Sequence, residues 1–242
     1  MRDLGKYEND YVNLDFEDII VSYRRKEVIT TIKKYSSQNI LEVGCGMEPL
    51  FLFYDNFKSF TVVEPSKKFY ENAFTFCNNK SNVKLFNETF EDFSVSNENL
   101  YDLIIISGLL HELEDPKSFL KYLKNFCKED TIVHINVPNA LSFHRLLAVE
   151  MGLIKDVYQL SDVQTKMQQF STFNLDQIKN LVNDYGFKVL DSGSFFIKPF
   201  THSQMNSIYK EKIINKNILN GLSKMQKYMP ELGTEIYLNI SL

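Results

Sequence analysis

The chain has 242 residues, 44% of them hydrophobic, so it can bury a full core as a single domain spanning 1–242. Its formal net charge is −4 and its basic residues are scattered, which argues against a nucleic-acid partner. No apolar run approaches the roughly 18 residues of a membrane span, and the N-terminus lacks a signal-peptide pattern, so we expect a cytoplasmic protein without a membrane span.

Helix-period segments alternate with short strands rich in Val, Ile and Phe, which is typical of a mostly parallel sheet. Residues 1–38 are expected to form an N-terminal helical cap whose main helix covers 15–35. The next predicted elements are strands at 39–43, 59–64, 83–87, 101–107 and 131–137, and helices at 49–54, 66–78 and 116–127.

The alternation breaks after the fifth strand. Residues 138–173 read as a helical, polar-rich insertion, where we expect the substrate contacts. A helix capped at Asn174 and ended by Gly186 should follow, then a strand, one more helix and a final strand over 234–241. These elements predict an α/β fold with seven strands, of which the last is antiparallel.

The three cysteines, Cys45, Cys77 and Cys127, have no metal-ligand spacing and are odd in number. We expect reduced thiols and no structural zinc. Clustered carboxylates and amides suitable for a divalent ion are also not evident, so no metal site is predicted.

The stretch "LEVGCGMEP" ends a predicted strand and contains two glycines, Gly44 and Gly46, that allow a ligand to approach the backbone closely. Glu48, at the expected start of a helix, would repel a pyrophosphate there. Glu42 adds a second carboxylate, which suits a ligand with an ammonium and a sulfonium group better than one with phosphates.

Glu64 ends the next strand, "FTVVE", where a carboxylate can accept hydrogen bonds from both hydroxyls of a ribose. The ligand should therefore contain a ribose and no pyrophosphate. S-adenosylmethionine meets both conditions.

Four stretches, "LEVGCG", "VVEPS", "NETFEDF" and "YDLIIISGLLHELEDPKSFL", occur in an order and spacing that resembles the class I S-adenosylmethionine-dependent methyltransferases over roughly 40–138. The resemblance implies a Rossmann-like sheet with helices on both faces. Glu48 departs from the family, since many members have Gly there. The implied cofactor contacts are Glu42, Gly44 and Gly46 at the methionine part, Glu64 at the ribose, Phe90 and Glu91 at the adenine, and Ser107 to Leu109 near the methyl group.

Two further groups are candidates for the cofactor side. Arg24, in the N-terminal helix, has a guanidinium that can pair with the cofactor carboxylate, although an exposed helix charge is the alternative. Tyr7 and Tyr11 are candidates for a lid over the cofactor.

A hydroxyl acceptor would need a general base. His111 follows the fourth strand, near where the family commonly has Glu, and His144 follows the fifth; both are candidate catalytic residues, with structural or surface roles as the alternatives. Arg145 and Asn139 are predicted to bind the substrate, and Arg145 with His144 could hold an anionic group. His134, inside a strand, is expected in the core.

These features predict methyl transfer to a hydroxyl oxygen of a small metabolite or bacterial surface sugar, and less readily to nitrogen. The "NPPY"-type motif that the resemblance would imply for a base nitrogen is replaced by "SGLLHE". Two alternatives stay open: a catalytically inactive S-adenosylmethionine-binding partner subunit, and a nucleotide-dependent oxidoreductase, against which Glu48 argues. The sequence does not predict an oligomeric state.

Overall fold

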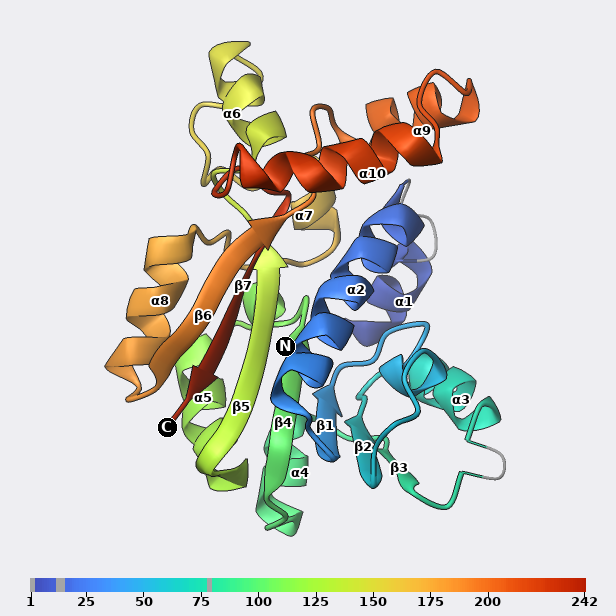
Figure 1. The fold of residues 1–242 in the computed structure, drawn as a ribbon, viewed down its shortest axis with the longest axis vertical. Coiled ribbons are helices and arrows are strands. Elements are labelled where there is room, and N and C mark those ends of the chain that lie inside the picture. Colours follow the sequence, from blue (N-terminus) through green and yellow to red (C-terminus); the bar gives the residue numbers. More distant parts are fainter. Residues whose placement is uncertain (1–2, 12–15, 78–79) are drawn as a thin grey trace.

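The computed structural model describes residues 3–11, 16–77 and 80–242, and it contains one seven-stranded sheet with helices on both faces (Figure 1). The strand order is β3-β2-β1-β4-β5-β7-β6. Pairs from β3 to β5 are parallel, whereas β7 is antiparallel to both β5 and β6. The prediction of a mostly parallel sheet with an antiparallel last strand is confirmed. The strands are β1 (Asn39–Val43), β2 (Ser59–Val63), β3 (Val83–Phe86), β4 (Tyr101–Ser107), β5 (Cys127–Pro138), β6 (Lys188–Phe195) and β7 (Glu235–Ser241).

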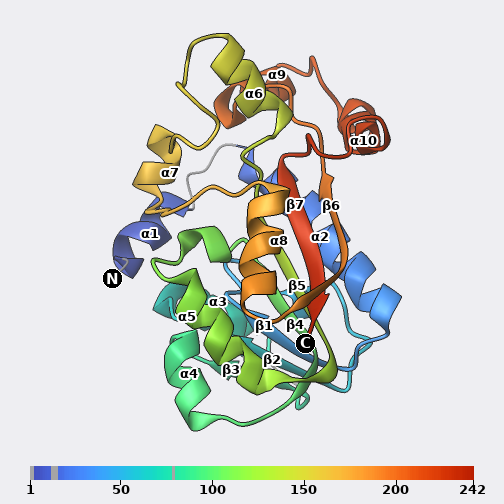
Figure 2. The same cartoon turned by 90° about the vertical axis from the view of Figure 1, so that its left-hand side faces the viewer.

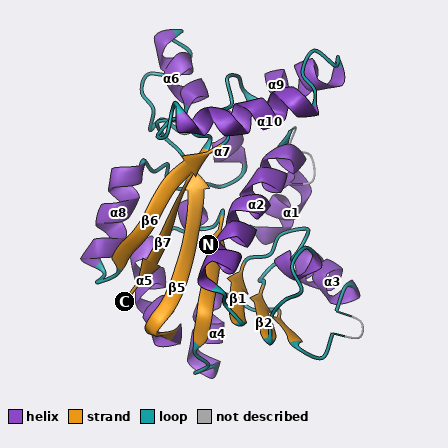
Figure 3. Cartoon of the chain, viewed as in Figure 1, coloured by secondary structure: helices purple, strands orange, loops and turns teal. Residues whose placement is uncertain are grey.

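The helices of the described segments lie around this sheet (Figure 3). They are α1 (Leu4–Tyr11), α2 (Glu17–Tyr35), α3 (Lys67–Thr75), α4 (Phe90–Ser96), α5 (Pro116–Leu123), α6 (Phe143–Glu150), α7 (Asp162–Lys166), α8 (Leu175–Asp184), α9 (His202–Lys210) and α10 (Lys216–Lys224). Four 3₁₀ turns accompany them: η1 (Leu50–Leu52), η2 (Leu110–Glu112), η3 (Lys124–Phe126) and η4 (Met225–Lys227).

The sheet is buried on both faces, as the continuous apolar runs of its strands require. In β4, Ile104 and Ile106 belong to the core cluster under α4, α5 and α8, while Leu103 and Ile105 belong to the cluster under α2 and α3. Figure 2 shows α4, α5 and α8 together on one side of the strands. The side-chain alternation of one strand therefore fills two separate cores.

The helix starts that the sequence indicated are present. The Ser66 hydroxyl accepts from the Phe69 N–H at 3.1 Å and caps α3. Asn174 caps α8 in a capping box, and Gly186, with φ +76°, follows the end of that helix. Pro116 occupies the first turn of α5.

Several predicted boundaries are wrong. The helix expected at 49–54 is only the 3₁₀ turn η1, because Pro49 is extended, with ψ 147°, and the short chain must return at once to β2. The predicted helix at 116–127 gives way to η3 after Leu123. The last single helix is instead two, α9 and α10, separated at Lys212, which has a positive φ, and capped anew by Asn215.

A third group of helices lies beyond the carboxyl ends of the strands. Figures 1 and 2 show α6, α9 and α10 above the carboxyl ends of β5 and β6 and the amino end of β7. A hydrophobic cluster joins Ile20 and Tyr23 of α2 to Met205 of α9 and Leu219 of α10. The insertion at 138–173 is helical only in α6 and α7, with residues 151–161 forming turns between them. These segments enclose the carboxyl edge of the sheet.

Across the described ranges, no helix combines the length and apolarity needed to cross a membrane.

Candidate functional site

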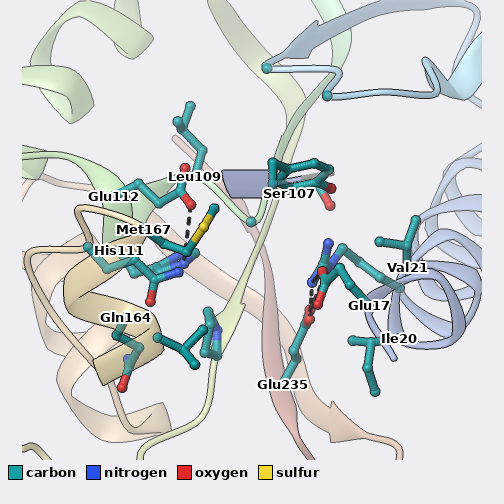
Figure 4. A pocket seen from close by; sticks show the side chains of 18 of the residues that line it. Glu17, Ile20, Val21, Ser107, Leu109, His111, Glu112, Gln164, Met167 and Glu235 are labelled. Carbon is teal, nitrogen blue, oxygen red and sulfur yellow. Dashed lines mark hydrogen bonds and ion pairs between the residues drawn. The ribbon is translucent and has the colours of Figure 1, made fainter. Parts of the chain in front are cut away.

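A cavity of about 1100 Å³ opens at the carboxyl ends of β1, β2, β4 and β5. This is the edge at which open α/β sheets bind ligands, and the strand order reverses between β1 and β4. Figure 4 shows His111, Glu112 and Met167 on one side of the cavity and Glu17, Val21 and Glu235 on the other. The cavity therefore lies between segments far apart in the sequence.

The glycine loop follows β1 and is held by the carboxylate that ends β2. Gly44 and Gly46 have φ of +77° and +58°, values that glycine adopts without strain. Glu64 accepts from the N–H groups of Cys45 at 2.9 Å, Gly46 at 3.2 Å and Ser66 at 2.9 Å. One carboxylate thus fixes the path of the loop.

Two buried carboxylates face the cavity at this loop. Burial raises the pKa of Glu64 to about 7, despite its three backbone donors, and burial raises the pKa of Glu42 to about 8. Glu42 also accepts from the Leu50 N–H at 3.0 Å. A ligand that brings hydroxyl donors or positive charge would favour the ionised form of both groups.

Glu48 has a different environment from the one that the sequence suggested. Its side chain is 55% exposed and pairs with Arg25 at 2.6 Å, and no α-helix begins at this loop. The cation that pairs with Glu48 also lies over the ring of Phe53, at 3.4 Å from its centroid. Glu48 therefore does not stand at the N-terminus of an α-helix, and the repulsion of a pyrophosphate expected there does not apply.

The two predicted adenine contacts do not line the cavity. Phe90 packs in the core against Phe93, Phe119 and Phe126, and Glu91 is exposed. The sequence did not indicate a helix at α4, and the motif could not show that the Phe90 ring turns into the core.

The end of β4 lines the cavity through Ser107, Gly108 and Leu109, and their contact with the cofactor stays a prediction. Gly108 has φ +70°, and its N–H donates to the Asn136 carbonyl at 2.9 Å. The Leu109 side chain lies 4.0 Å from where a Cβ would stand at Gly44, so the two loops touch.

His111 and Glu112 lie in η2 and are both buried at the cavity wall. The His111 Nε2 is 3.9 Å from the Glu112 Oε1. The His111 carbonyl accepts from the N–H groups of Phe170 and Ser171, at 3.1 and 3.3 Å. The insertion is thereby attached to the turn that carries His111.

His144, on α6, also lines the cavity. Its buried Nδ1 has no hydrogen-bond partner among the residues that the structure describes. Burial lowers the pKa of His144 well below its usual range, and the positive charges of Lys198, His202 and Arg145 lower it further. At neutral pH the ring is therefore uncharged.

The two predicted substrate contacts line the cavity but are engaged within the protein. The Asn139 amide donates to the carbonyls of Glu231 and Gly233, at 2.8 and 2.9 Å, and its oxygen accepts from the Leu141 N–H. The Arg145 guanidinium donates to the insertion, at the Val157 carbonyl, the Gln159 carbonyl and the Gln164 Oε1.

Arg24 is neither exposed nor free. It donates to both oxygens of Glu235 and to Glu17, and the Glu235 oxygen also accepts from the Asn136 amide at 2.8 Å. Burial would raise the pKa of Glu17, but Arg24 and His202 bring it down to about 2. A direct contact between Arg24 and a cofactor carboxylate stays a prediction, and this side chain already has two carboxylate partners.

Sequence reasoning missed several titratable residues of the cavity wall, among them Glu17, Glu235, Lys198 and His202. Lys198 is completely buried, and its Nζ lies 2.6 Å from the His202 Nδ1, while the His202 Nε2 lies 3.4 Å from Glu17. Burial lowers the pKa of Lys198 to about 7. Local sequence carries no signal for this chain of contacts, because its members come from α2, β7 and the segment after β6.

Helix α1 lies against the end of the cavity that the glycine loop, residues 44–46, forms. The rings of Tyr7 and Tyr11 contact the Phe69 ring, with centroids 6.0 and 5.5 Å away, and both tyrosines line the cavity. Asp10 pairs with Lys166 of α7 at 3.2 Å. The two predicted lid residues thus stand at the cavity wall, and the Tyr11 hydroxyl lies 3.7 Å from where a Cβ would stand at Gly46.

In the described part of the chain, no three His, Cys, Asp or Glu side chains are grouped so that they could hold a metal ion. His134 is fully buried in β5, as expected, and hydrogen-bonds with Asn239 at 2.8 Å.

Comparison with known proteins gives a consistent result. Residues 20–192 match the family model described as a methyltransferase domain. No curated protein sequence matches the chain.

Solved structures show the fold. The plantazolicin methyltransferase BamL, in complex with a triazolic desmethylPZN analog and SAH, is similar with TM-score 0.61 and 15% identity, over 93% of this chain and 87% of that one. An S-adenosylmethionine-dependent methyltransferase from Clostridium acetobutylicum is similar with TM-score 0.59 and 13% identity, over 97% and 98%. The N-methyltransferase NodS from Bradyrhizobium japonicum, in complex with SAH, is similar with TM-score 0.53 and 11% identity, over 89% and 86%.

Proposed function

The chain belongs to the methyltransferase domain family, and from this premise we propose that it transfers a methyl group from S-adenosylmethionine to a hydroxyl oxygen of a small-molecule acceptor. It is an S-adenosylmethionine-dependent methyltransferase. The proposal covers the acceptor class and the residues that act in the reaction. It also covers the division of the chain into a cap at 1–38 and an insertion at 138–173 that shapes the substrate site.

The glycine-loop end suits the cofactor. The positive φ values of Gly44 and Gly46 leave room for a close approach, and Glu64 has carboxylate lone pairs to accept from ribose hydroxyls. Glu42, buried and facing the same loop, favours the positive end of the methionine part. Ser107 and Leu109 would line the cofactor at the end of β4.

The part of the cavity away from the glycine loop, here called the acceptor end, contains the candidate general bases. Bound S-adenosylmethionine supplies an electrophilic methyl carbon on its sulfonium, so the protein mainly aligns a nucleophile and takes its proton. His144 lines the cavity with an uncharged ring, and a nitrogen of this ring would accept the hydroxyl proton. His111, at the cavity wall beside Glu112, is the second candidate base.

The observation that carries the proposal is one cavity that runs from the glycine loop and Glu64 to His144. A site for the cofactor alone would need no such extension. The enclosing helices α1, α6 and α9 also favour a low-molecular-weight acceptor over nucleic acid.

The test is transfer of radiolabelled methyl from S-adenosylmethionine to a panel of phenols, sugars and hydroxy acids. At least one compound should be methylated, and His144→Asn should lower turnover by about 10²- to 10⁴-fold, the usual contribution of a general base. Binding of S-adenosylhomocysteine should not change in that variant, which controls for its folding. The same experiment with His111→Asn assigns the base between the two residues.

Two outcomes would contradict the proposal. Cofactor binding with no methylated compound would favour an inactive binding subunit. Undiminished turnover in both histidine variants would show that neither residue takes a proton.

A further inference from the structure

One corner of the cavity is lined by four basic side chains. It is formed by His144 and Arg145 of α6, by Lys198 after β6, and by His202 of α9, and we call these four residues the cationic corner. None of the residues proposed to hold the cofactor belongs to it. Figures 1 and 2 place α6 and α9 beyond the tips of β5 and β6, away from β1 and β2.

Among the described residues, Lys198 and Arg145 make no hydrogen bond or ion pair to a carboxylate. Within the described ranges, the Lys198 Nζ has one polar partner, the His202 Nδ1 at 2.6 Å, and no ion pair. Arg145 donates only to neutral oxygens of the insertion, at distances of 2.5 to 3.0 Å. A buried charge without a counter-ion is expensive, so the corner is electrostatically incomplete.

The nearest carboxylates do not supply the missing charge. Glu17 and Glu235 both face Lys198, but they are shared by Arg24, which binds both, and Glu17 also contacts the His202 Nε2 at 3.4 Å. Asp156 is a third carboxylate, and its charge acts on Arg145. Of the three basic side chains Arg24, Arg145 and Lys198, Lys198 is thus the one left without a carboxylate of its own within the described ranges.

The titratable groups respond to this imbalance. Burial lowers the pKa of Lys198 to about 7, and Arg145 lowers it further while Glu17 and Glu235 oppose the change. The pKa of His144 is lowered by burial and then by Lys198, His202 and Arg145. An anion at this point would favour the charged form of Lys198 and would make His144 a stronger base.

We propose that the cationic corner receives an oxyanion, a carboxylate or a phosphate group, carried by the methyl acceptor. The part-buried rings of His202 and His144 are the surfaces that the anion would contact, with Lys198 supplying charge from behind His202. This inference rests on the proposed function and names the acceptor class, a hydroxyl compound that is also an acid.

The test uses benzoate and inorganic phosphate as probes and benzamide as the neutral match of benzoate. Each is titrated by calorimetry into protein saturated with S-adenosylhomocysteine. We expect one site for at least one anion, with benzamide at least tenfold weaker, and the stronger anion distinguishes a carboxylate from a phosphate. Lys198→Met should weaken that anion about tenfold or more, whereas Lys210→Met, at an exposed lysine of α9, should not.

Equal anion binding by Lys198→Met and the native protein would overturn the proposal. Failure of both anions to bind, or displacement of the anion by S-adenosylhomocysteine, would overturn it as well. Lys198→Gln keeps a hydrogen-bond donor for His202 and replaces the Met variant if that one does not fold. Binding of S-adenosylhomocysteine alone is measured first, because its absence contradicts the proposed function, whereas its presence without anion binding contradicts only this inference.

Discussion

The two ends of the cavity hold their charged groups in different ways. At the glycine-loop end, Glu64 is held by backbone N–H groups of residues near it in the fold. Toward the acceptor end, next to Gly108, Arg24 is held by the side chains of Glu17 and Glu235, the second of them 211 positions away. The backbone N–H donors are present whatever side chains the loop carries. A network of side chains, in contrast, loses hydrogen bonds when any one of its members is replaced. Single substitutions should therefore affect stability most at the acceptor end.

The largest effect is expected from Arg24→Met, which would leave Glu17 and Glu235 buried without their cation. Breaking a buried ion pair by removing one partner costs about 3–5 kcal/mol. Denaturant unfolding should show this loss in the free energy of unfolding. Arg25→Met is the matched control, because its partner Glu48 is 55% exposed and such a pair contributes about 1 kcal/mol or less. Equal losses of unfolding free energy in Arg24→Met and Arg25→Met would contradict this difference between the two ends of the cavity.

A smaller, pH-dependent effect is expected at Lys198. The folded pKa is lowered to about 7, below the unfolded lysine value, so the ionised form destabilises the folded state. This penalty is fully present below pH 7 and disappears as the pH rises toward 10. The free energy of unfolding of the native protein, measured against Lys198→Met, should therefore rise by about 2–4 kcal/mol from pH 7 to pH 10. If the difference in free energy of unfolding between the two proteins does not change from pH 7 to pH 10, Lys198 is not desolvated.

The difference between the two ends also explains what the sequence could predict. The strands, the glycine loop and the position of Glu64 follow from short-range patterns, because strand periodicity and the two glycines act on neighbouring residues. The antiparallel β7 was also predictable, since the connection before it is long enough to return beside β5.

The acceptor end was not predictable in the same way. Glu235 reaches Arg24 only because β7 inserts between β5 and β6, and no local pattern carries that strand order. Lys198 stands in the stretch "IKPF", which gives no sign that its amine is buried. Phe90 illustrates the same limit, since its place after β3 was clear but the direction of its ring depends on packing with α5 and η3.

The central claim is that S-adenosylmethionine binds at the glycine loop through Glu64. The most direct measurement is calorimetric binding of S-adenosylhomocysteine to the native protein and to Glu64→Ala, with the exposed Glu98→Ala as the matched control. The account predicts binding by the native protein and by Glu98→Ala, with affinity reduced about tenfold to a hundredfold or more in Glu64→Ala, because hydrogen bonds to a charged group are lost. No binding by the native protein, or equal binding by all three, would contradict it.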